Sequence, residues 1–465
     1  MVFSSLVFLY IFLPAVLLLY YIIPRKGKNF VLLIFSLFFY AWGEPVYVLG
    51  ILASVIINYF FGRALEKHHS KALLTVNIVL NLGYLAVFKY TGFALGTLNK
   101  LFGLDMEVLQ IALPIGISFY TFQALSYTID VYRKNVPAGK NIIDFGAYIT
   151  MFPQLIAGPI VRYKTVEREL RTRKETLADF TQGIVRFASG LGKKVIIANS
   201  VGQIWDAIRN GSQGDLTTAT VWLGMICFTL QIYFDFSGYS DMAIGLGRMF
   251  GFHFDENFNY PYISRSITEF WRRWHISLST WFKEYVYIPL GGNRKGLARQ
   301  LRNIFVVWLL TGLWHGAAWS FVLWGLYYGI LLIFEKVVFH KALEKIPKAF
   351  GHIYTMIIVV IGWGIFGFAD VLPELRTGFV KGAFFAGNYG LCDGHTLFLL
   401  SGNIVLLAVA VIISTGVITK LVKKYIVKYE TVYAVGSMLY VAAIFFVSTA
   451  CIVADTYNPF LYFRF

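Results

Sequence analysis

Apolar segments recur from one end of the chain to the other, separated by short polar breaks. Most of them approach the roughly 20 residues that an α-helix needs to cross a bilayer. The clear segments are 5–24, 29–47, 48–63, 72–90, 111–129, 181–198, 217–236, 303–335, 352–370, 398–418 and 431–452. This pattern predicts an all-α integral membrane protein with about eleven transmembrane helices.

The first apolar segment, residues 2–24, carries no charged residue. It has neither the basic start nor the A-x-A cleavage site of a secretory signal peptide, so we expect a retained first helix. No long polar stretch suggests a separate soluble domain, and the sequence shows no internal repeat. The expected organisation is a single multi-pass membrane domain over residues 1–465.

Some apolar segments break the simple pattern. Residues 152–159 hold two prolines, a glycine and Gln154, which a lipid-facing helix does not tolerate. Broken backbone at membrane depth occurs inside protein or beside a water-filled cavity. We therefore expect a re-entrant segment there, and Leu113-Pro114-Ile115-Gly116 opens another helix with similar features.

The segment 303–334 is too long for one crossing. Its 32 residues would form a helix of about 48 Å, whereas the hydrocarbon core is about 30 Å thick. We expect a break near Gly316.

Residues 253–302 mix aromatic and basic side chains. Trp271, Trp274, Leu278 and Trp281 recur at helical spacing, and tryptophan favours the membrane interface. This predicts an amphipathic helix near the cytoplasmic face. Together with the re-entrant segment, it completes an expected architecture of helices around a central funnel or tunnel.

Composition supports lipid as the surrounding medium. Apolar residues make up 57% of the chain and charged residues 14%, against about a quarter charged in soluble proteins. The net charge is +16, and the basic residues lie in the short polar breaks between apolar segments, as they do in cytoplasmic loops. We therefore expect membrane lipids as neighbours and no nucleic acid as partner, while some basic residues can attract an anionic acyl donor. The three cysteines contain no C-x-x-C motif, so neither a disulfide framework nor a zinc site is indicated.

His315 is the main candidate for chemistry. It lies deep in an apolar segment, where ionisable residues are rare and are functional candidates by default. Burial favours neutral imidazole, the form that can take a proton from a hydroxyl. Small neighbours such as Gly312 and Gly316 leave room for a substrate. A histidine that bridges two helices by hydrogen bonds fits the residue type equally well.

His275 is the second candidate, although packing is the commoner role for a histidine among tryptophans at an interface. Asp235 and Asp241 fit three roles: orienting a histidine, pairing with an arginine, or holding a helix end. No metal motif is present. The candidate lining residues of the substrate path are Gln154, Asp235, Ser237, Asp241, Asn257, Trp271, Trp274 and Trp314.

Long ordered strings in this sequence resemble the membrane-bound O-acyltransferases. Within that family they resemble the bacterial alginate O-acetyltransferase (AlgI-like) group more than the related teichoic-acid D-alanylation (DltB-like) proteins. The strings are 113–123, 152–163, 233–241, 256–281, 311–319 and 458–465.

The resemblance implies an O-acyltransferase in the bacterial cytoplasmic membrane. It implies His315 as the catalytic base, and His275 as the residue that positions the thioester or stabilises the oxyanion. The donor would be a cytosolic acyl thioester, from acetyl-CoA or an acyl-carrier protein, used as substrate with no bound cofactor. A short acyl group, acetyl, would pass through the protein for O-acetylation of an exported or cell-wall polysaccharide. Implied partners are an extracytoplasmic SGNH-type acetyltransferase or other acyl-acceptor protein, and polysaccharide export machinery.

Two other classes fit the membrane pattern. A transporter or flippase also uses broken helices and buried polar residues, but we find no internal inverted repeat. A structural scaffold of an export complex would tolerate loss of both histidines, whereas an acyltransferase would not.

Overall fold

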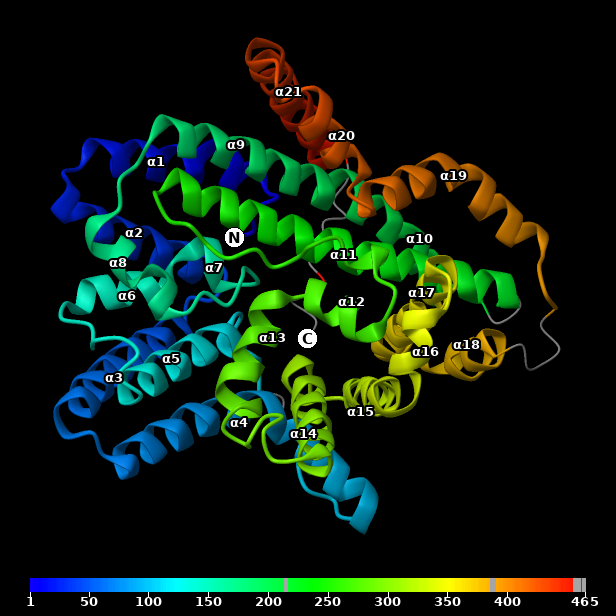
Figure 1. Cartoon of the computed structure of the whole chain (residues 1–465), viewed down its shortest axis with the longest axis horizontal. Helices are drawn as coiled ribbons and strands as arrows, with labels where there is room; N and C mark the ends of the chain where they lie inside the picture. Colours follow the sequence, from blue (N-terminus) through cyan, green and yellow to red (C-terminus); the bar gives the residue numbers. More distant parts are fainter. Residues whose placement is uncertain (110, 213–215, 385–389, 455–460, 462–465) are drawn as a thin grey trace. The chain divides into compact units, whose positions relative to one another are not determined.

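Helices are the regular elements that the described residues form in the computed structural model (Figure 1). The structure describes residues 1–465 except 110, 213–215, 385–389, 455–460 and 462–465. The chain divides into two compact units that interleave along the sequence. Unit 1 comprises Met1–Ala188, Tyr239–Glu256 and Thr280–Val286, and unit 2 comprises Ser189–Gly238, Asn257–Ser279 and Tyr287–Phe465. The expected single domain stays a prediction.

Each unit has its own set of helices. Unit 1 contains η1 (Phe8–Phe12), α1 (Leu13–Ile22), α2 (Arg25–Ala41), α3 (Val48–His68), α4 (Lys71–Phe102), α5 (Ile117–Tyr132), α6 (Ile142–Thr150), α7 (Phe152–Leu155) and α8 (Tyr163–Thr172). Unit 2 contains η2 (Lys193–Ala198), α10 (Asn199–Arg209), η4 (Pro261–Ile263), α12 (Ile267–Arg273), α14 (Leu297–His315), α15 (Trp319–Phe334), η6 (Glu335–Phe339), α16 (His340–Lys345), α17 (Lys348–Gly367), η7 (Phe368–Asp370), η8 (Pro373–Leu375), α18 (Arg376–Ala383), α19 (Gly394–Ser414), α20 (Val417–Tyr425) and α21 (Glu430–Ala454). Four elements contribute residues to both units: α9 (Leu177–Gly192), α11 (Thr218–Met249), α13 (Ile276–Phe282) and η5 (Lys283–Tyr287).

Within the described residues, 7 helices are long and apolar enough to cross a membrane. They are Val48–His68, Lys71–Phe102, Thr218–Met249, Trp319–Phe339, Lys348–Asp370, Gly394–Ser414 and Glu430–Ala454. Some other predicted segments form shorter helices, such as α5 and α9 with 16 residues each. An all-α multi-pass protein is confirmed, while the number of about eleven crossings and the central funnel stay predictions.

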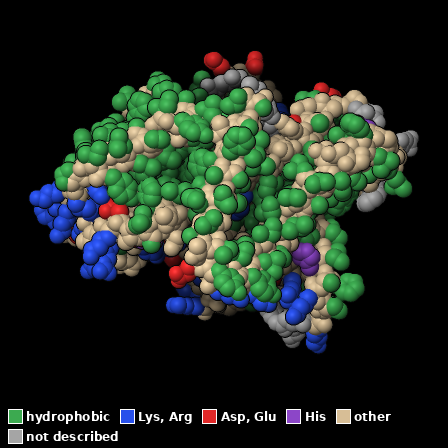
Figure 2. Space-filling model, turned by 90° about the horizontal axis from the view of Figure 1, so that it is seen from above, with side chains coloured by type: hydrophobic (Ala, Val, Ile, Leu, Met, Phe, Trp, Pro, Cys, Tyr) green, Lys and Arg blue, Asp and Glu red, His purple; other side chains and the backbone are tan. Residues whose placement is uncertain are grey.

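Burial separates core helices from lipid-facing ones. The apolar stretch of α11 is 83% buried, whereas that of α21 is 6% buried. Apolar side chains that a soluble protein would hide stay exposed on the outer helices, and Figure 2 shows hydrophobic side chains over much of the face in view. In a bilayer this surface meets lipid tails, which accept it at no hydrophobic penalty.

A buried ladder of amides joins three helices of unit 1, α3, α4 and α5, which pack against one another (Figure 1). The side-chain oxygen of Asn58 accepts from Asn77 and Asn81, both at 2.9 Å. Asn58 donates in turn to Asn81 at 3.1 Å, and Thr128 donates to Asn77 at 2.8 Å. Polar side chains that bond across helices in this way hold membrane helices together.

The proline-rich segment 152–159 lies entirely inside the protein. Its only helix is the four-residue α7, and every residue from 152 to 159 is buried, so the prediction that it does not face lipid is confirmed. Gly116 caps the start of α5 with φ +76°, and a Cβ there would lie 2.6 Å from the carbonyl oxygen of Leu155. The two unusual segments of the sequence therefore pack against each other, and glycine is required at their contact.

The long apolar segment breaks near Gly316, as predicted. Helix α14 ends at His315 and α15 begins at Trp319. The two helices then pack very closely, because a Cβ on Gly312 would lie 2.4 Å from the Phe321 carbonyl oxygen. This close approach fixes the end of α14, and therefore the place of His315.

The amphipathic region is not one helix, so this prediction is wrong. It forms α12 and α13, separated by Trp274 and His275, and His275 has φ +44° in the left-handed region. The backbone N–H of Ile276 is instead bonded to the carbonyl of Asn257 at 2.9 Å. A tertiary contact with an upstream segment therefore overrides the helical spacing of the tryptophans.

Candidate active site

His275 lies at the junction of α12 and α13 and is 2% exposed. Its Nδ1 lies 3.1 Å from Oδ1 of Asn257, which is fully buried. The same oxygen accepts the backbone N–H of Ser277 at 3.2 Å and its hydroxyl at 2.9 Å. The imidazole is thus anchored through one nitrogen to Asn257, whose side-chain oxygen also binds Ser277.

The other nitrogen of His275 is buried without a hydrogen-bond partner among the described residues. Rings cover the imidazole: Phe236 of α11 lies edge-on at 4.6 Å and Trp314 of α14 at 6.0 Å between ring centres. Burial lowers the pKa of His275 well below its usual value, and neighbouring His315 lowers it further. The side chain is therefore a neutral imidazole at physiological pH.

His315 is the last residue of α14 and is 8% exposed. Its ring lies 5.1 Å from that of Trp324 and 5.2 Å from that of Phe366, edge to face in both cases. The carbonyl end of a helix favours positive charge. A proton taken up by His315 would therefore be stabilised by the end of its own helix.

The two histidines share a neighbour. The ring of Trp314 lies 6.0 Å from His275 and 5.1 Å from His315, so the two imidazole centres are at most about 11 Å apart. This is within the roughly 15 Å that chemistry on one small acyl group requires. Unit 2 therefore brings both predicted histidines to one place.

Trp271 and Trp274 belong to the same aromatic cluster of unit 2. Trp274 packs on Trp363 at 4.7 Å, and Trp271 contacts Tyr328 at 4.8 Å. These contacts are ring packing, and the role of both tryptophans in lining a substrate path stays a prediction.

Asp235 and Ser237 lie on the part of α11 that belongs to unit 2. Asp235 forms an ion pair of 2.7 Å with Lys194 of η2, both side chains being 3% exposed. It also accepts the backbone N–H of Leu461 at 2.9 Å. These bonds give Asp235 a structural role, while the buried hydroxyl of Ser237 has no partner among the described residues.

Gln154 and Asp241 belong to unit 1. Asp241 pairs with Arg186 at 2.6 Å, and Arg186 also binds Glu256 at 2.6 Å. Gln154 donates to the carbonyl of Tyr148, and its own side-chain oxygen is buried without a partner among the described residues. One of the three roles expected for the aspartates, pairing with an arginine, thus holds for Asp241.

Ser277 and Trp324 were missed by the sequence interpretation. Ser277 stands two residues after His275 and shares its anchor on Asn257, so its place in the motif was a usable signal. Trp324 lies in α15 among other apolar residues, and no local sequence pattern distinguishes it from a residue that only packs in the core.

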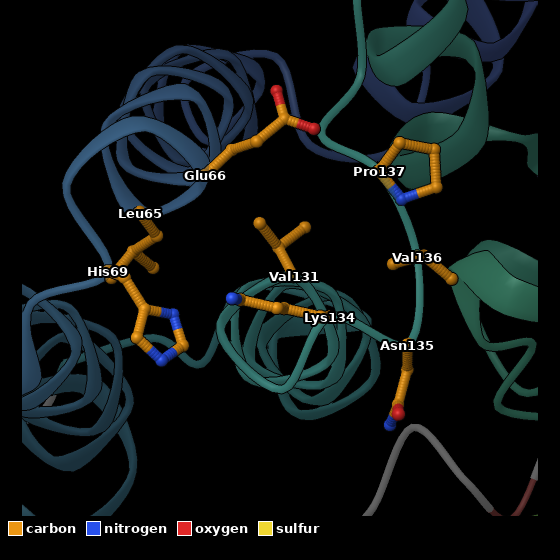
Figure 3. Close-up of a pocket in the computed structure, with 8 residues that line it drawn as sticks. All are labelled: Leu65, Glu66, His69, Val131, Lys134, Asn135, Val136 and Pro137. Carbon is orange, nitrogen blue, oxygen red and sulfur yellow. The ribbon is translucent and has the colours of Figure 1, made fainter.

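A surface cavity of about 310 Å³ lies elsewhere in unit 1 and contains none of the predicted site residues (Figure 3). It is lined by Leu65, Glu66, His69, Val131, Lys134, Asn135, Val136 and Pro137. Figure 3 shows the Glu66 carboxylate extending toward the loop that carries Pro137, where it accepts the backbone N–H of Ala138 at 2.9 Å. His69 stacks on Tyr132 at 4.5 Å. Both side chains are occupied by structural contacts.

Comparison with known proteins gives consistent matches along most of the chain. The model of the membrane-bound O-acyltransferase family matches residues 6–371. A probable alginate O-acetylase AlgI of Azotobacter vinelandii is 44% identical over 423 residues, covering 89% of this chain and 84% of the relative. A peptidoglycan O-acetyltransferase of Helicobacter pylori is 32% identical over 431 residues, covering 84% and 81%. A teichoic acid D-alanyltransferase of Bacillus subtilis is 29% identical over 277 residues, covering 55% and 67%.

The family match and the apolar helices agree on location and class. The protein is a multi-pass protein of the bacterial cytoplasmic membrane and an O-acyltransferase. The two histidines of unit 2 lie within the matched residues 6–371. The chain therefore belongs to the membrane-bound O-acyltransferase family.

Proposed function

We propose that the protein moves an acetyl group from a cytosolic thioester across the membrane for O-acetylation of an exported or cell-wall polysaccharide. The support for a polysaccharide acceptor is the set of relatives, which are named for alginate, peptidoglycan and teichoic acid. The support for acetyl as the transferred group is that the two relatives with higher identity are named as an O-acetylase and an O-acetyltransferase.

The observation that carries the proposal is the buried pair of histidines around Trp314 in unit 2. In the proposed reaction, an acceptor hydroxyl attacks the thioester carbonyl as His315 takes the hydroxyl proton. The new C–O bond forms, the C–S bond breaks, and the leaving thiolate takes the proton from His315. The carbonyl end of α14 stabilises the imidazolium in between.

The proposed donor is acetyl-CoA or an acetylated carrier protein, used as substrate. The proposed partners are an extracytoplasmic SGNH-type acetyltransferase and the polysaccharide export machinery. A path for the acyl group would run past Ser237 of unit 2, whose buried hydroxyl has no hydrogen-bond partner among the described residues.

The test is replacement of His315 by alanine in cells that produce the polymer. We expect His315→Ala to insert at wild-type level and to abolish ester-linked acetate on the surface polymer, because no base then takes the hydroxyl proton. His68→Ala is the matched control, since His68 is exposed at the end of α3. Wild-type acetate in a well-expressed His315→Ala protein would exclude the general-base role.

A further inference from the structure

The orientation of the Asn257 side chain is fixed by a backbone group. The N–H of Ser277 can only donate, so the atom of Asn257 that it meets at 3.2 Å is the amide oxygen. The Ser277 hydroxyl donates to the same oxygen at 2.9 Å. The end of Asn257 that faces His275 is therefore a hydrogen-bond acceptor.

This orientation determines the tautomer of His275. Nδ1 lies 3.1 Å from the Asn257 oxygen, and two acceptors do not bond, so Nδ1 carries the proton. Because burial keeps the imidazole neutral, Nε2 then holds a lone pair and no hydrogen. Nε2 is also the buried atom without a partner among the described residues.

We propose that Asn257 is a positioning residue that locks His275 with Nδ1 protonated, so that Nε2 accepts a hydrogen bond from the substrate. This rests on the proposed function and excludes one of the two roles that the family resemblance implies for His275, stabilising the oxyanion. Stabilising an oxyanion requires a donor, and neutral His275 in this tautomer offers none at Nε2. His275 therefore binds and orients a substrate O–H or N–H beside His315.

Two substrate groups have this chemistry. One is a hydroxyl of the polysaccharide acceptor, and the other is an amide N–H in the pantetheine arm of an acyl thioester. They differ in which Michaelis constant they control, so kinetics with both substrates separates them.

The test of the lock is Asn257→Asp, assayed in membrane vesicles that hold the full chain. Acetyl-CoA is the donor probe, alginate oligosaccharides are the acceptor probe, and the range is about pH 5 to about pH 9. The carboxylate still accepts from Nδ1 but favours imidazolium, which raises the pKa of His275. We expect near wild-type rates at the alkaline end and an acid limb moved upward by about 1 pH unit or more.

The groups around the His275 imidazole are known, and they decide what a shift of the acid limb means. His315 is the titratable group of α14 that acts on His275. The rings of Phe236 from α11 and Trp314 from α14 are neutral, and α13 presents the Ser277 hydroxyl. A shift of the limb in Asn257→Asp therefore reports the new carboxylate.

Two further variants complete the comparison. Asn257→Leu keeps no acceptor, so we expect a loss of about 10-fold or more at every pH. Asn210→Asp makes the same change at an exposed position after α10, and its pH profile should match wild type. Equal losses in Asn257→Asp and Asn257→Leu with no shift of the limb would mean that Asn257 is merely structural, and would overturn the proposal.

The bound group is identified with His275→Asn, whose shorter side chain does not reach the place of Nε2. A KM raised about 10-fold for acetyl-CoA alone indicates the donor amide, and one raised for the oligosaccharide alone indicates the acceptor hydroxyl. Unchanged KM for both substrates would overturn the acceptor role of Nε2. Failure of the proposed function looks different, because transfer would then survive His315→Ala.

Discussion

Two buried polar clusters, one in each unit, differ in how many of their hydrogen-bonding groups have a partner within the protein. In the Asn58–Asn77–Asn81 ladder of unit 1, each amide donates and accepts within the cluster or to its own helix. In the Asn257–His275–Ser277 cluster of unit 2, three polar groups converge on one oxygen and leave Nε2 of His275 without a partner among the described residues.

The difference separates structural from functional polar residues in a membrane protein. In a closed cluster every hydrogen-bonding group is paired within the protein. Such a cluster stabilises helix packing and has no group available to bind a ligand. A cluster with one buried atom left open bears a desolvation penalty of about 1–3 kcal/mol, which a bound substrate removes. The Lys194–Asp235 ion pair is in the same unit as the histidines and has a structural role, because Asp235 also accepts the backbone N–H of Leu461.

The largest expected effect tests that assignment of Lys194. Lys194→Met leaves the Asp235 carboxylate buried and unpaired, which should destabilise the protein by about 3–5 kcal/mol. The double variant Lys194→Met/Asp235→Asn removes the charge and keeps an acceptor for the Leu461 N–H, so it should recover most of the loss. Thermal unfolding of the detergent-purified protein measures both.

Arg171→Ala is the matched control for this pair, because the Arg171 side chain is 39% exposed and pairs with Glu167 at 3.3 Å. Its loss should destabilise by about 1 kcal/mol or less. If the double variant is no more stable than Lys194→Met, the ion pair does not have the structural role assigned to it.

A smaller effect is expected in the amide ladder. Asn58→Leu removes the shared partner of Asn77 and Asn81 and should lower the free energy of unfolding by about 2 kcal/mol. Acetyl transfer per folded molecule should stay at the wild-type level, the reverse of Asn257→Leu. Asn403→Leu, which loses only a bond to its own helix in α19, should change stability less. Loss of specific activity in Asn58→Leu would contradict the assignment of the amide ladder as purely structural.

The smallest effect is a pH dependence in unit 1, outside the membrane-spanning segments. Burial lowers the pKa of His253, but hydrogen bonds to Glu169 and Asp179 outweigh it, and the pKa is raised above its usual value. The contribution to stability is therefore full below about pH 6.5 and is lost as the pH rises through the raised pKa.

Melting temperatures between about pH 6 and about pH 9 measure this contribution. The fall in stability of wild type over this range should be shallower in His253→Gln, which does not titrate. A fall of equal size in both proteins would show that another group causes it.

The sequence predicted those features of the site that depend on length and local composition. The break after His315 follows from an apolar segment of 32 residues, which exceeds one crossing. The buried proline segment follows from its inability to face lipid. The family resemblance pointed to both histidines, which unit 2 then brings together.

Features that depend on tertiary partners could not be predicted. The helical spacing of Trp271 and Trp274 continues past His275 in sequence, but the bonds to Asn257, 18 residues upstream, end the helix there. The partners of Asp235 and Asp241 lie in η2 and α9, and no local pattern indicates such pairs. The matching tail string 458–465 falls outside the described residues except for Leu461.

The left-handed backbone of His275, with φ +44°, restricts which residues position 275 can hold at all. Glycine enters this region freely, histidine, asparagine and aspartate enter it several-fold more often than other residues, and β-branched residues are genuine outliers there. Saturation mutagenesis should therefore yield folded protein from a short and unusual set of replacements. Alanine at this position would carry about 1–2 kcal/mol of backbone strain in addition to the lost imidazole. Asparagine removes the imidazole with much less strain, which makes it the cleaner reference for the chemistry of His275.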